Sequence, residues 1–374
     1  MRYLIPLILV SQIIIFPQLS FRWCKEASMQ AFIIVLLSSL IWQKNKCLSL
    51  FILWSFVLFL LGRSFIVNDY GIDAPSIMIN LPAFISMINI VLIGVLYYFL
   101  RTIKIDRDIV YKAFAFVAVF QSIYIIIQAL QLDQFFFNIS QWLQTNPKRV
   151  CWTVGTWGNE ALVSWCIAIC SPYLLAFKGF RYKAGYVISF IAVLLTKCTF
   201  GLVGFVGGFI FWLFFKSWKS AVALLILLAL VGGVFYINGS LTEYFNPTHR
   251  FEVWKKSIDI WKEKPMTGQG LGSYRVLFWQ RAPEFRSDGH WAQAHNEYIQ
   301  LLFESGIIGL GLMLALMWIT FYQFLKSGVG VVPITCLVVT AIIALAGFPF
   351  RTAMGVIPLI SLALFERELY GTAI

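Results

Sequence analysis

The chain has 374 residues, of which 60% are hydrophobic and only 12% are charged. Because soluble domains average about 25% charged residues, this composition excludes a soluble globular protein. The net charge of +12 does not by itself indicate nucleic-acid binding, since Lys and Arg also collect in the cytoplasmic loops of membrane proteins.

Apolar segments long enough to cross a bilayer recur along the whole chain. A transmembrane helix needs about 20 apolar residues, whereas the strands of a membrane barrel are short and alternating, so an all-α protein is expected. No small-residue cleavage site follows the first segment, which indicates a retained helix that also targets the chain. We predict a polytopic membrane protein with about twelve transmembrane helices in one integral domain, residues 1–374. The predicted helix cores are Leu4–Leu19, Gln30–Trp42, Leu48–Leu61, Phe84–Phe99, Val110–Ala129, Leu162–Leu175, Gly185–Leu195, Gly201–Phe215, Ala221–Ile237, Gly306–Phe324, Val331–Leu345 and Gly355–Leu364.

Lys and Arg are distributed unevenly over the short loops between these helices. One set of loops holds fourteen of them and the opposite set holds seven. Because positively charged loops stay in the cytoplasm, both termini are predicted to be cytoplasmic and the long polar segment 238–296 to be extracytoplasmic. Cys24 and Cys151 then share the outer side, and the sequence leaves open whether they form a disulfide.

The polar segment 238–296, called the large loop below, carries the groups that can titrate near neutral pH. It contains all three histidines of the chain, His249, His290 and His295. Its acidic and basic residues nearly balance, so it does not form a nucleic-acid-binding surface. The seven cysteines of the chain are scattered without metal-site spacing. The large loop therefore indicates an enzyme that acts on a membrane-anchored, phosphate-bearing substrate.

Within the large loop, the pattern predicts a short amphipathic helix. Asn246-Pro247-Thr248 resembles a helix start. Phe251, Trp254, Ile258 and Trp261 then recur at spacings of three or four and form one apolar face. Such a helix fits a position on the outer leaflet. Its apolar face is otherwise expected to pack against the transmembrane bundle, which we prefer to a ligand role for Trp254 and Trp261.

A glycine run, Gly268-Gln269-Gly270-Leu271-Gly272, follows this helix and predicts a flexible turn. Backbone without side chains can approach a ligand closely. No strand is expected before the run and no helix start after it, so the run does not predict a nucleotide-binding loop.

Three segments resemble elements of the O-antigen ligase and polymerase superfamily of bacterial inner membranes. Gly155-Thr156-Trp157-Gly158-Asn159 is similar to a family element that opens a helix. Residues 250–272, with Arg250, Trp254 and the Pro265-to-Gly272 run, look like a second element. Residues 295–306, beginning His295-Asn296 and containing Glu304 and Gly306, look like a third. The resemblance covers roughly the second half of the chain, and the first half matches only in hydropathy.

The resemblance implies a C-type glycosyltransferase-like fold and transfer of a glycan from undecaprenyl diphosphate at the periplasmic face. The acceptor is lipid A-core in ligases, another lipid-linked repeat unit in polymerases, and a protein hydroxyl in related oligosaccharyltransferases. Inversion at the sugar is implied, with no metal and no other cofactor. Expected partners are the lipid-linked donor, a glycolipid or glycan acceptor and membrane lipids, with no nucleic acid.

Residue chemistry points to the same reaction. An acceptor hydroxyl needs a base that titrates near neutral pH, and His295 stands where the chain re-enters the membrane. A leaving diphosphate needs fixed positive charge, for which Arg250 matches the family position and Arg275 is a helper. Glu304, Asn296 and Asn159 are expected to support the site. The alternatives are an interfacial histidine bonded to backbone, and an Arg250 that anchors the interface or pairs with a nearby Glu.

One departure from the family concerns the outer start of the eighth predicted helix. Many members carry Ser-Arg-Gly there, whereas this chain reads Thr196-Lys197-Cys198-Thr199-Phe200-Gly201, with Phe200 in the Arg position. Lys197 is expected to substitute as a point charge. A polymerase shares every motif named above and remains an alternative to a ligase. A transporter or flippase is the other alternative, although it would place ionisable residues within the helix cores, which here are nearly free of charge.

Overall fold

The computed structural model describes residues 106–132, 153–155, 159–226, 250–270, 272–285, 291, 293–328, 330–351 and 353–370. Within these ranges the chain is mostly helical and contains no strand, as the all-α prediction requires. The first four predicted helix cores, Cys24, Cys151, His249 and His290 lie outside the described residues. The described residues fall into two compact units: the first holds those up to 226 and from 321 onward, and the second holds 250–320.

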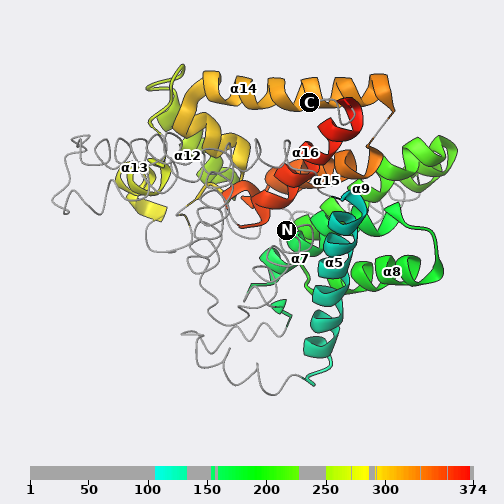
Figure 1. Cartoon of the computed structure of the whole chain (residues 1–374). Helices are drawn as coiled ribbons and strands as arrows, with labels where there is room; N and C mark the ends of the chain where they lie inside the picture. The colour runs from blue at the N-terminus through cyan, green and yellow to red at the C-terminus, as the bar shows by residue number, and fades with distance from the viewer. Residues whose placement is uncertain are drawn as a thin grey trace, which may run out of the picture. The chain divides into compact units, whose positions relative to one another are not determined.

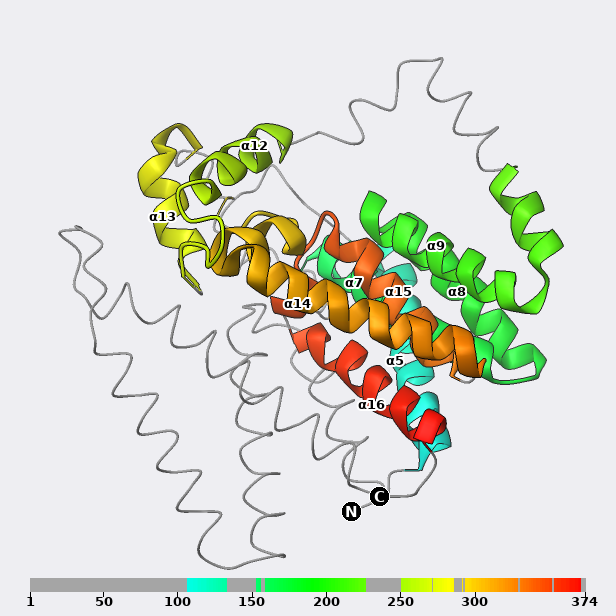
Figure 2. The same ribbon diagram turned by 90° about the horizontal axis from the view of Figure 1, so that it is seen from above.

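The first unit is a bundle of apolar helices (Figures 1 and 2). Helix α5 packs against α7 and α8, while α9 packs against α7 and α15, and α15 against α16. Residues 218–226 are also helical, at the start of the ninth predicted core. The helices of this unit are α5 (Arg107–Ala129), α7 (Glu160–Cys170), η2 (Ser171–Ala176), α8 (Phe180–Leu195), α9 (Thr199–Lys216), α15 (Val331–Ala344), η4 (Pro349–Arg351), η5 (Ala353–Gly355) and α16 (Val356–Tyr370).

Glycines on α9 allow its close approach to α15. A Cβ added at Gly204 would lie 2.7 Å from Ile343, and one at Gly208 would lie 2.2 Å from Val339. Small residues at helix crossings are typical of membrane bundles, because packing rather than water exclusion holds the helices together.

The sixth predicted core, Leu162–Leu175, is not one continuous α-helix. Helix α7 ends at Cys170, and the tighter 3-10 helix η2 continues from Ser171 to Ala176. Pro172 stands in the first turn of η2. Proline lacks a backbone N–H and clashes with the preceding turn, which explains why the α-helix stops here.

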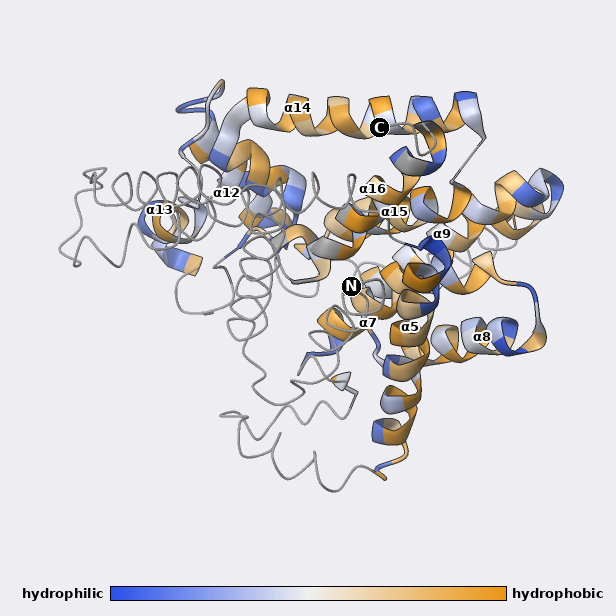
Figure 3. Cartoon of the chain, in the orientation of Figure 1, coloured by the Kyte–Doolittle hydropathy of each residue, from blue (hydrophilic) through white to orange (hydrophobic). Residues whose placement is uncertain are grey.

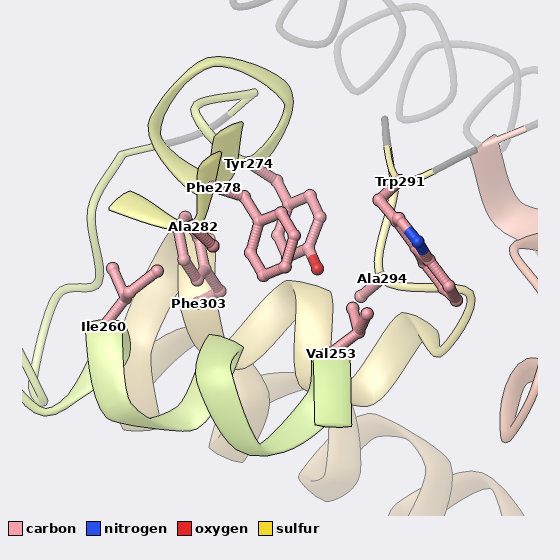
Figure 4. Close-up of a cluster of buried hydrophobic side chains, with 8 residues drawn as sticks. All are labelled: Val253, Ile260, Tyr274, Phe278, Ala282, Trp291, Ala294 and Phe303. Atoms are coloured by element: carbon pink, nitrogen blue, oxygen red, sulfur yellow. The ribbon is translucent and has the colours of Figure 1, made fainter. Parts of the chain in front are cut away.

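The second unit contains α12 (Arg250–Trp261), α13 (Tyr274–Arg281), η3 (Pro283–Phe285) and most of α14 (Glu297–Ser327). Its core is a cluster of side chains from α12, α13, the 291–294 segment and Phe303 of α14 (Figure 4). The Tyr274 and Phe278 rings stack at the centre of this cluster, with centroids 5.0 Å apart. Helix α14 is kinked at Gly306, whose φ of 66° and ψ of −166° are not helical.

Three of the described helices are long and apolar enough to cross a membrane: α5, α9 and α14. The shorter apolar segments Glu160–Ala176 and Val331–Ala344 accompany them. Figure 3 shows these helices to be largely hydrophobic, whereas α12 and α13 mix polar and apolar residues. These segments match five of the predicted cores, and the total of twelve spans remains a prediction.

Candidate functional site

His295 lies in the short segment that leads into α14, and its backbone is strained. Its φ of 51° places a non-glycine residue in the left-handed region, at a cost of about 1–3 kcal/mol. The imidazole is partly buried and meets the Trp291 indole edge-on, with ring centroids 5.6 Å apart. A residue held in this conformation needs neighbours that fix its backbone, and the structure provides them on both sides.

On the C-terminal side of His295, Asn296 caps helix α14. Its side-chain oxygen accepts hydrogen bonds from the backbone N–H groups of Tyr298 and Ile299, each 3.0 Å long. These N–H groups have no partner within the helix, which is why Asn is favoured at such a position. The expectation that Asn296 supports the site thus has a definite form: it fixes the helix start directly after His295.

On the N-terminal side, the Ala294 peptide groups are held by two side chains. The Trp254 indole Nε1 of α12 donates to the Ala294 carbonyl oxygen at 2.7 Å. The Ala294 N–H donates to Oε1 of Gln300 at 3.1 Å, and Nε2 of Gln300 donates to Oε1 of Glu304 at 3.1 Å. Gln300 and Glu304 are 3% and 1% exposed. Glu304 therefore lies at the end of a buried hydrogen-bonded chain that leads to the residue before His295.

Sequence reasoning did not single out Gln300, and it assigned Trp254 only to packing. Gln300 stands four residues after Asn296 and four before Glu304, a spacing that places all three on one side of a helix. Its spacing of four residues from each of these two motif residues was the available signal.

The glycine run approaches α14 rather than open space, so the expectation of a ligand-approach turn is wrong for Gly268. A Cβ on Gly268 would lie 2.5–2.6 Å from the backbone of Glu304, Ser305 and Gly306. Helix α13 also begins at Tyr274, close after the run, contrary to the expectation that no helix start follows it. Four backbone hydrogen bonds join residues 265–270 to α14: Gln269 N–H to Phe303 O (2.8 Å), Gly270 N–H to Glu304 O (2.9 Å), Ile307 N–H to Pro265 O (2.9 Å) and Ile308 N–H to Met266 O (3.3 Å).

Helix α12 exists where the pattern predicted it, but the predicted apolar face is not the buried one. Val253, Ser257 and Ile260 are its buried residues, whereas Phe251 is 53% exposed. The Ser257 hydroxyl donates to the Val253 carbonyl and lies 2.8 Å from the hydroxyl of Tyr274. The side chains of α13 and Phe303 determine which face is buried, and a helical repeat cannot reveal them.

The predicted cations of the large loop occupy different settings. Arg250 is the first residue of α12 and is partly buried. Arg275 lies on α13. Arg281, at the end of α13, pairs with Glu263 at 3.2 Å, and Lys256 pairs with Glu284 at 3.7 Å. Arg250 is thus carried by the same helix as Trp254, which contacts the segment before His295.

Burial raises the pKa of the Tyr274 phenol above its ordinary value, and the nearby Glu304 carboxylate adds to the shift, against the hydrogen bond with Ser257. Tyr274 therefore stays protonated at neutral pH. Its hydroxyl forms a hydrogen bond with Ser257 inside the core of the second unit and is not a candidate acid or base.

In the first unit, the two predicted site residues stand at helix ends. The Asn159 side chain caps α7 by accepting from the N–H groups of Ala161 (2.9 Å) and Leu162 (3.1 Å). The helix opening predicted from Gly155–Asn159 is confirmed at Asn159. Gly155 has a φ of 58°, and its N–H donates to Oε1 of Gln128 at 2.8 Å.

Lys197 forms the turn between α8 and α9. It is exposed, and its φ of 54° is left-handed. A left-handed residue often ends a helix, but glycine usually occupies that position. The start of α9 packs closely on α7, since a Cβ on Gly201 would lie 1.8 Å from Oγ of Ser164. The Lys197 turn therefore leads into α9, which packs against α7, the helix that Asn159 caps.

Comparison with known proteins bears on this arrangement. Residues 184–314 match the model of the O-antigen ligase family. The matched segment is about a third of the chain, and it is similar to the O-antigen ligase and polymerase superfamily. The match begins within α8 and ends within α14. No curated protein matches the chain.

This match confirms, over residues 184–314, the resemblance drawn from the motifs. The matched segment contains Lys197, Arg250, Arg275, His295, Asn296 and Glu304, while Asn159 precedes it. The match supports O-antigen ligase or polymerase-type glycan processing, with lipid-linked glycans as the class of substrate that the family implies. The apolar helices agree with a bacterial membrane protein.

Proposed function

We propose that this protein transfers a glycan from undecaprenyl diphosphate to the hydroxyl of a glycolipid acceptor, such as lipid A-core, at the periplasmic face of the bacterial inner membrane. The observation that carries the proposal is the strained and firmly held backbone of His295 within the segment that matches the O-antigen ligase family. Left-handed non-glycine residues tend to persist at functional sites, where surrounding contacts impose them. Lys197 and Gln131 are the other such residues among those described, and Lys197 is one of the predicted site residues.

In the proposed reaction, His295 accepts the proton of the acceptor hydroxyl as that oxygen forms its bond to the anomeric carbon. The bond from this carbon to the diphosphate breaks, and its electron pair remains on the diphosphate. Attack from the face opposite the leaving group inverts the sugar. The base needs a pKa near neutral to be free at working pH and still accept the proton, and imidazole meets this requirement.

Fixed positive charge on the leaving diphosphate lowers the barrier to its departure. Arg250 is proposed as the principal donor, since a guanidinium can bind two phosphate oxygens at once. Lys197 adds a point charge in place of the family Arg, and Arg275 assists. Asn296 and Glu304 support the His295 segment, and Asn159 supports the α7 end. No metal or cofactor is required by this scheme.

In the decisive experiment, purified protein in nanodiscs receives a defined undecaprenyl-diphosphate glycan as donor. The acceptor is either lipid A-core or a second molecule of the lipid-linked glycan. Transfer to lipid A-core alone supports a ligase. Elongation of the lipid-linked glycan without lipid A-core identifies a polymerase, the alternative that shares every motif. Movement of the intact lipid-linked glycan across the bilayer without any new glycosidic bond would instead identify a flippase.

A further inference from the structure

The backbone orientation of His295 depends on the peptide that joins it to Ala294. The dihedral φ of His295 is the rotation about its N–Cα bond, so fixing the Ala294 carbonyl fixes one side of that rotation. Trp254 holds this carbonyl from α12 through its 2.7 Å hydrogen bond. The indole is therefore in a position to impose the left-handed φ of 51° on His295.

Gln300 holds the preceding peptide and leaves little freedom for its own side chain. Its oxygen accepts from the Ala294 N–H and its nitrogen donates to Glu304, each at 3.1 Å. A flipped amide would present N–H to N–H and oxygen to carboxylate, so only one orientation satisfies both partners. The backbone N–H of Gln300 also donates to the carbonyl of Asn296 at 3.0 Å. Gln300 thus contacts the residues on both sides of His295.

The location of Ala294 makes this arrangement rigid. Ala294 is fully buried in the cluster at the core of the second unit. Figure 4 shows Ala294 next to Val253 of α12, with Trp291 on the same side of the cluster. The imidazole of His295 packs edge-on against Trp291. The backbone before His295 and the ring beside it therefore belong to one packed group.

We propose that Trp254 and Gln300 are positioning residues for His295: by holding the Ala294 peptide groups, they aim the imidazole at the acceptor hydroxyl. This inference rests on the proposed function, and it assigns to Trp254 a role beyond packing. Misplacing a catalytic group by about 1 Å costs up to roughly a hundredfold in rate. Loss of either hydrogen bond should therefore lower turnover while leaving substrate binding intact.

The test compares two tryptophans on the same helix. Trp254→Phe removes the hydrogen bond to Ala294 but keeps an aromatic ring in the core. Trp261→Phe is the matched control, because its indole donates to a different carbonyl, that of Pro265, at 3.0 Å. Gln300→Met provides a second variant that keeps the side-chain length. Each is assayed for kcat and KM in nanodiscs with the acceptor that supports transfer, after size-exclusion chromatography and measurement of Tm.

For Trp254→Phe we expect kcat to fall about 10- to 100-fold with KM within about threefold of wild type, and Gln300→Met to behave similarly. Trp261→Phe should keep wild-type kcat. Equal losses for both tryptophan variants, or a Trp254→Phe effect confined to KM, would overturn the inference. If Gln300→Met does not yield folded protein, Trp254→Phe decides alone.

His295→Ala, measured in parallel, separates failure of this inference from failure of the proposed function. Wild-type transfer by His295→Ala would remove the proposed base and the positioning role with it. Loss of transfer in His295→Ala together with full kcat in Trp254→Phe would overturn the positioning role only.

Discussion

Gly268 and Gly306 lie in direct backbone contact. A Cβ on Gly268 would come within 2.6 Å of the Gly306 nitrogen, and a Cβ on Gly306 would come within 2.2 Å of the Met266 carbonyl oxygen. Both glycines have positive φ, 68° and 66°. Their contact fixes the glycine run against the kink of α14, two residues beyond Glu304.

Gly306→Ala should therefore destabilise the protein. The substitution introduces a clash with backbone and places alanine in the left-handed region, for a cost of at least about 1–3 kcal/mol. Gly311→Ala on the same helix is the control, since a Cβ there meets nothing within 4 Å and alanine favours a helix. Thermal unfolding in detergent should show a lower Tm for Gly306→Ala alone. Equal Tm values for the two variants would contradict the contact.

His295→Ala should nearly abolish transfer while the protein stays folded. General base catalysis contributes about 10²–10⁴-fold, and the variant loses that contribution. The measurement is the single-turnover rate of glycan transfer in nanodiscs. His249→Ala is expected to keep most activity, and a comparable loss there would mean that the wrong histidine has been chosen.

Arg250→Lys should impair transfer even though the charge is retained. One ammonium cannot reproduce the two parallel hydrogen bonds of a guanidinium on a diphosphate, and a charge-assisted bond contributes about 1.5–3 kcal/mol. We expect a loss of roughly tenfold or more in kcat/KM. Lys255→Arg, an exposed change on the same helix, is the control. Wild-type activity of Arg250→Lys would reduce Arg250 to an interfacial anchor.

Lys197→Ala should weaken both carrier-lipid binding and transfer, because Lys197 is proposed to replace the Arg that Phe200 displaces. Lys197→Gly separates charge from backbone strain, since glycine adopts the observed φ of 54° freely. Similar losses in the two variants point to the charge. If both variants bind the carrier lipid and transfer glycan as the wild type does, Lys197 does not bind the diphosphate. That group must then be bound by Arg250 and its neighbours.

The predicted topology places the large loop outside. A single cysteine introduced at Ser287, in a variant without native cysteines, should react with a membrane-impermeant maleimide added to intact spheroplasts. A cysteine introduced at Ser217, at the end of α9, should react only after the membrane is opened. The reverse pattern would invert the assignment drawn from loop charge.

Local patterns were enough to predict several features of this chain. The apolar runs located α5, α8, α9, α15 and the apolar part of α14, because the cost of exposing backbone to lipid requires long apolar helices. Asn159 and Asn296 were selected with their motifs, and both prove to be caps. A cap depends on the side chain and the next few residues, so the neighbouring sequence contains most of the information.

The tertiary structure alone decided which side of α12 is buried, what the glycine run approaches and what holds His295. The hydrogen bond from Trp254 to Ala294 spans 40 residues, and no periodicity or spacing records a bond of that kind. The break after Cys170, by contrast, follows from Pro172 in the local sequence, and the predicted core Leu162–Leu175 ran through it because the apolar pattern continues. The sequence by itself determined a helical protein with apolar helices long enough to cross a membrane and a segment similar to the O-antigen ligase family. The positions of its reactive groups follow from long-range packing, because burial and hydrogen bonding are set by neighbours in space.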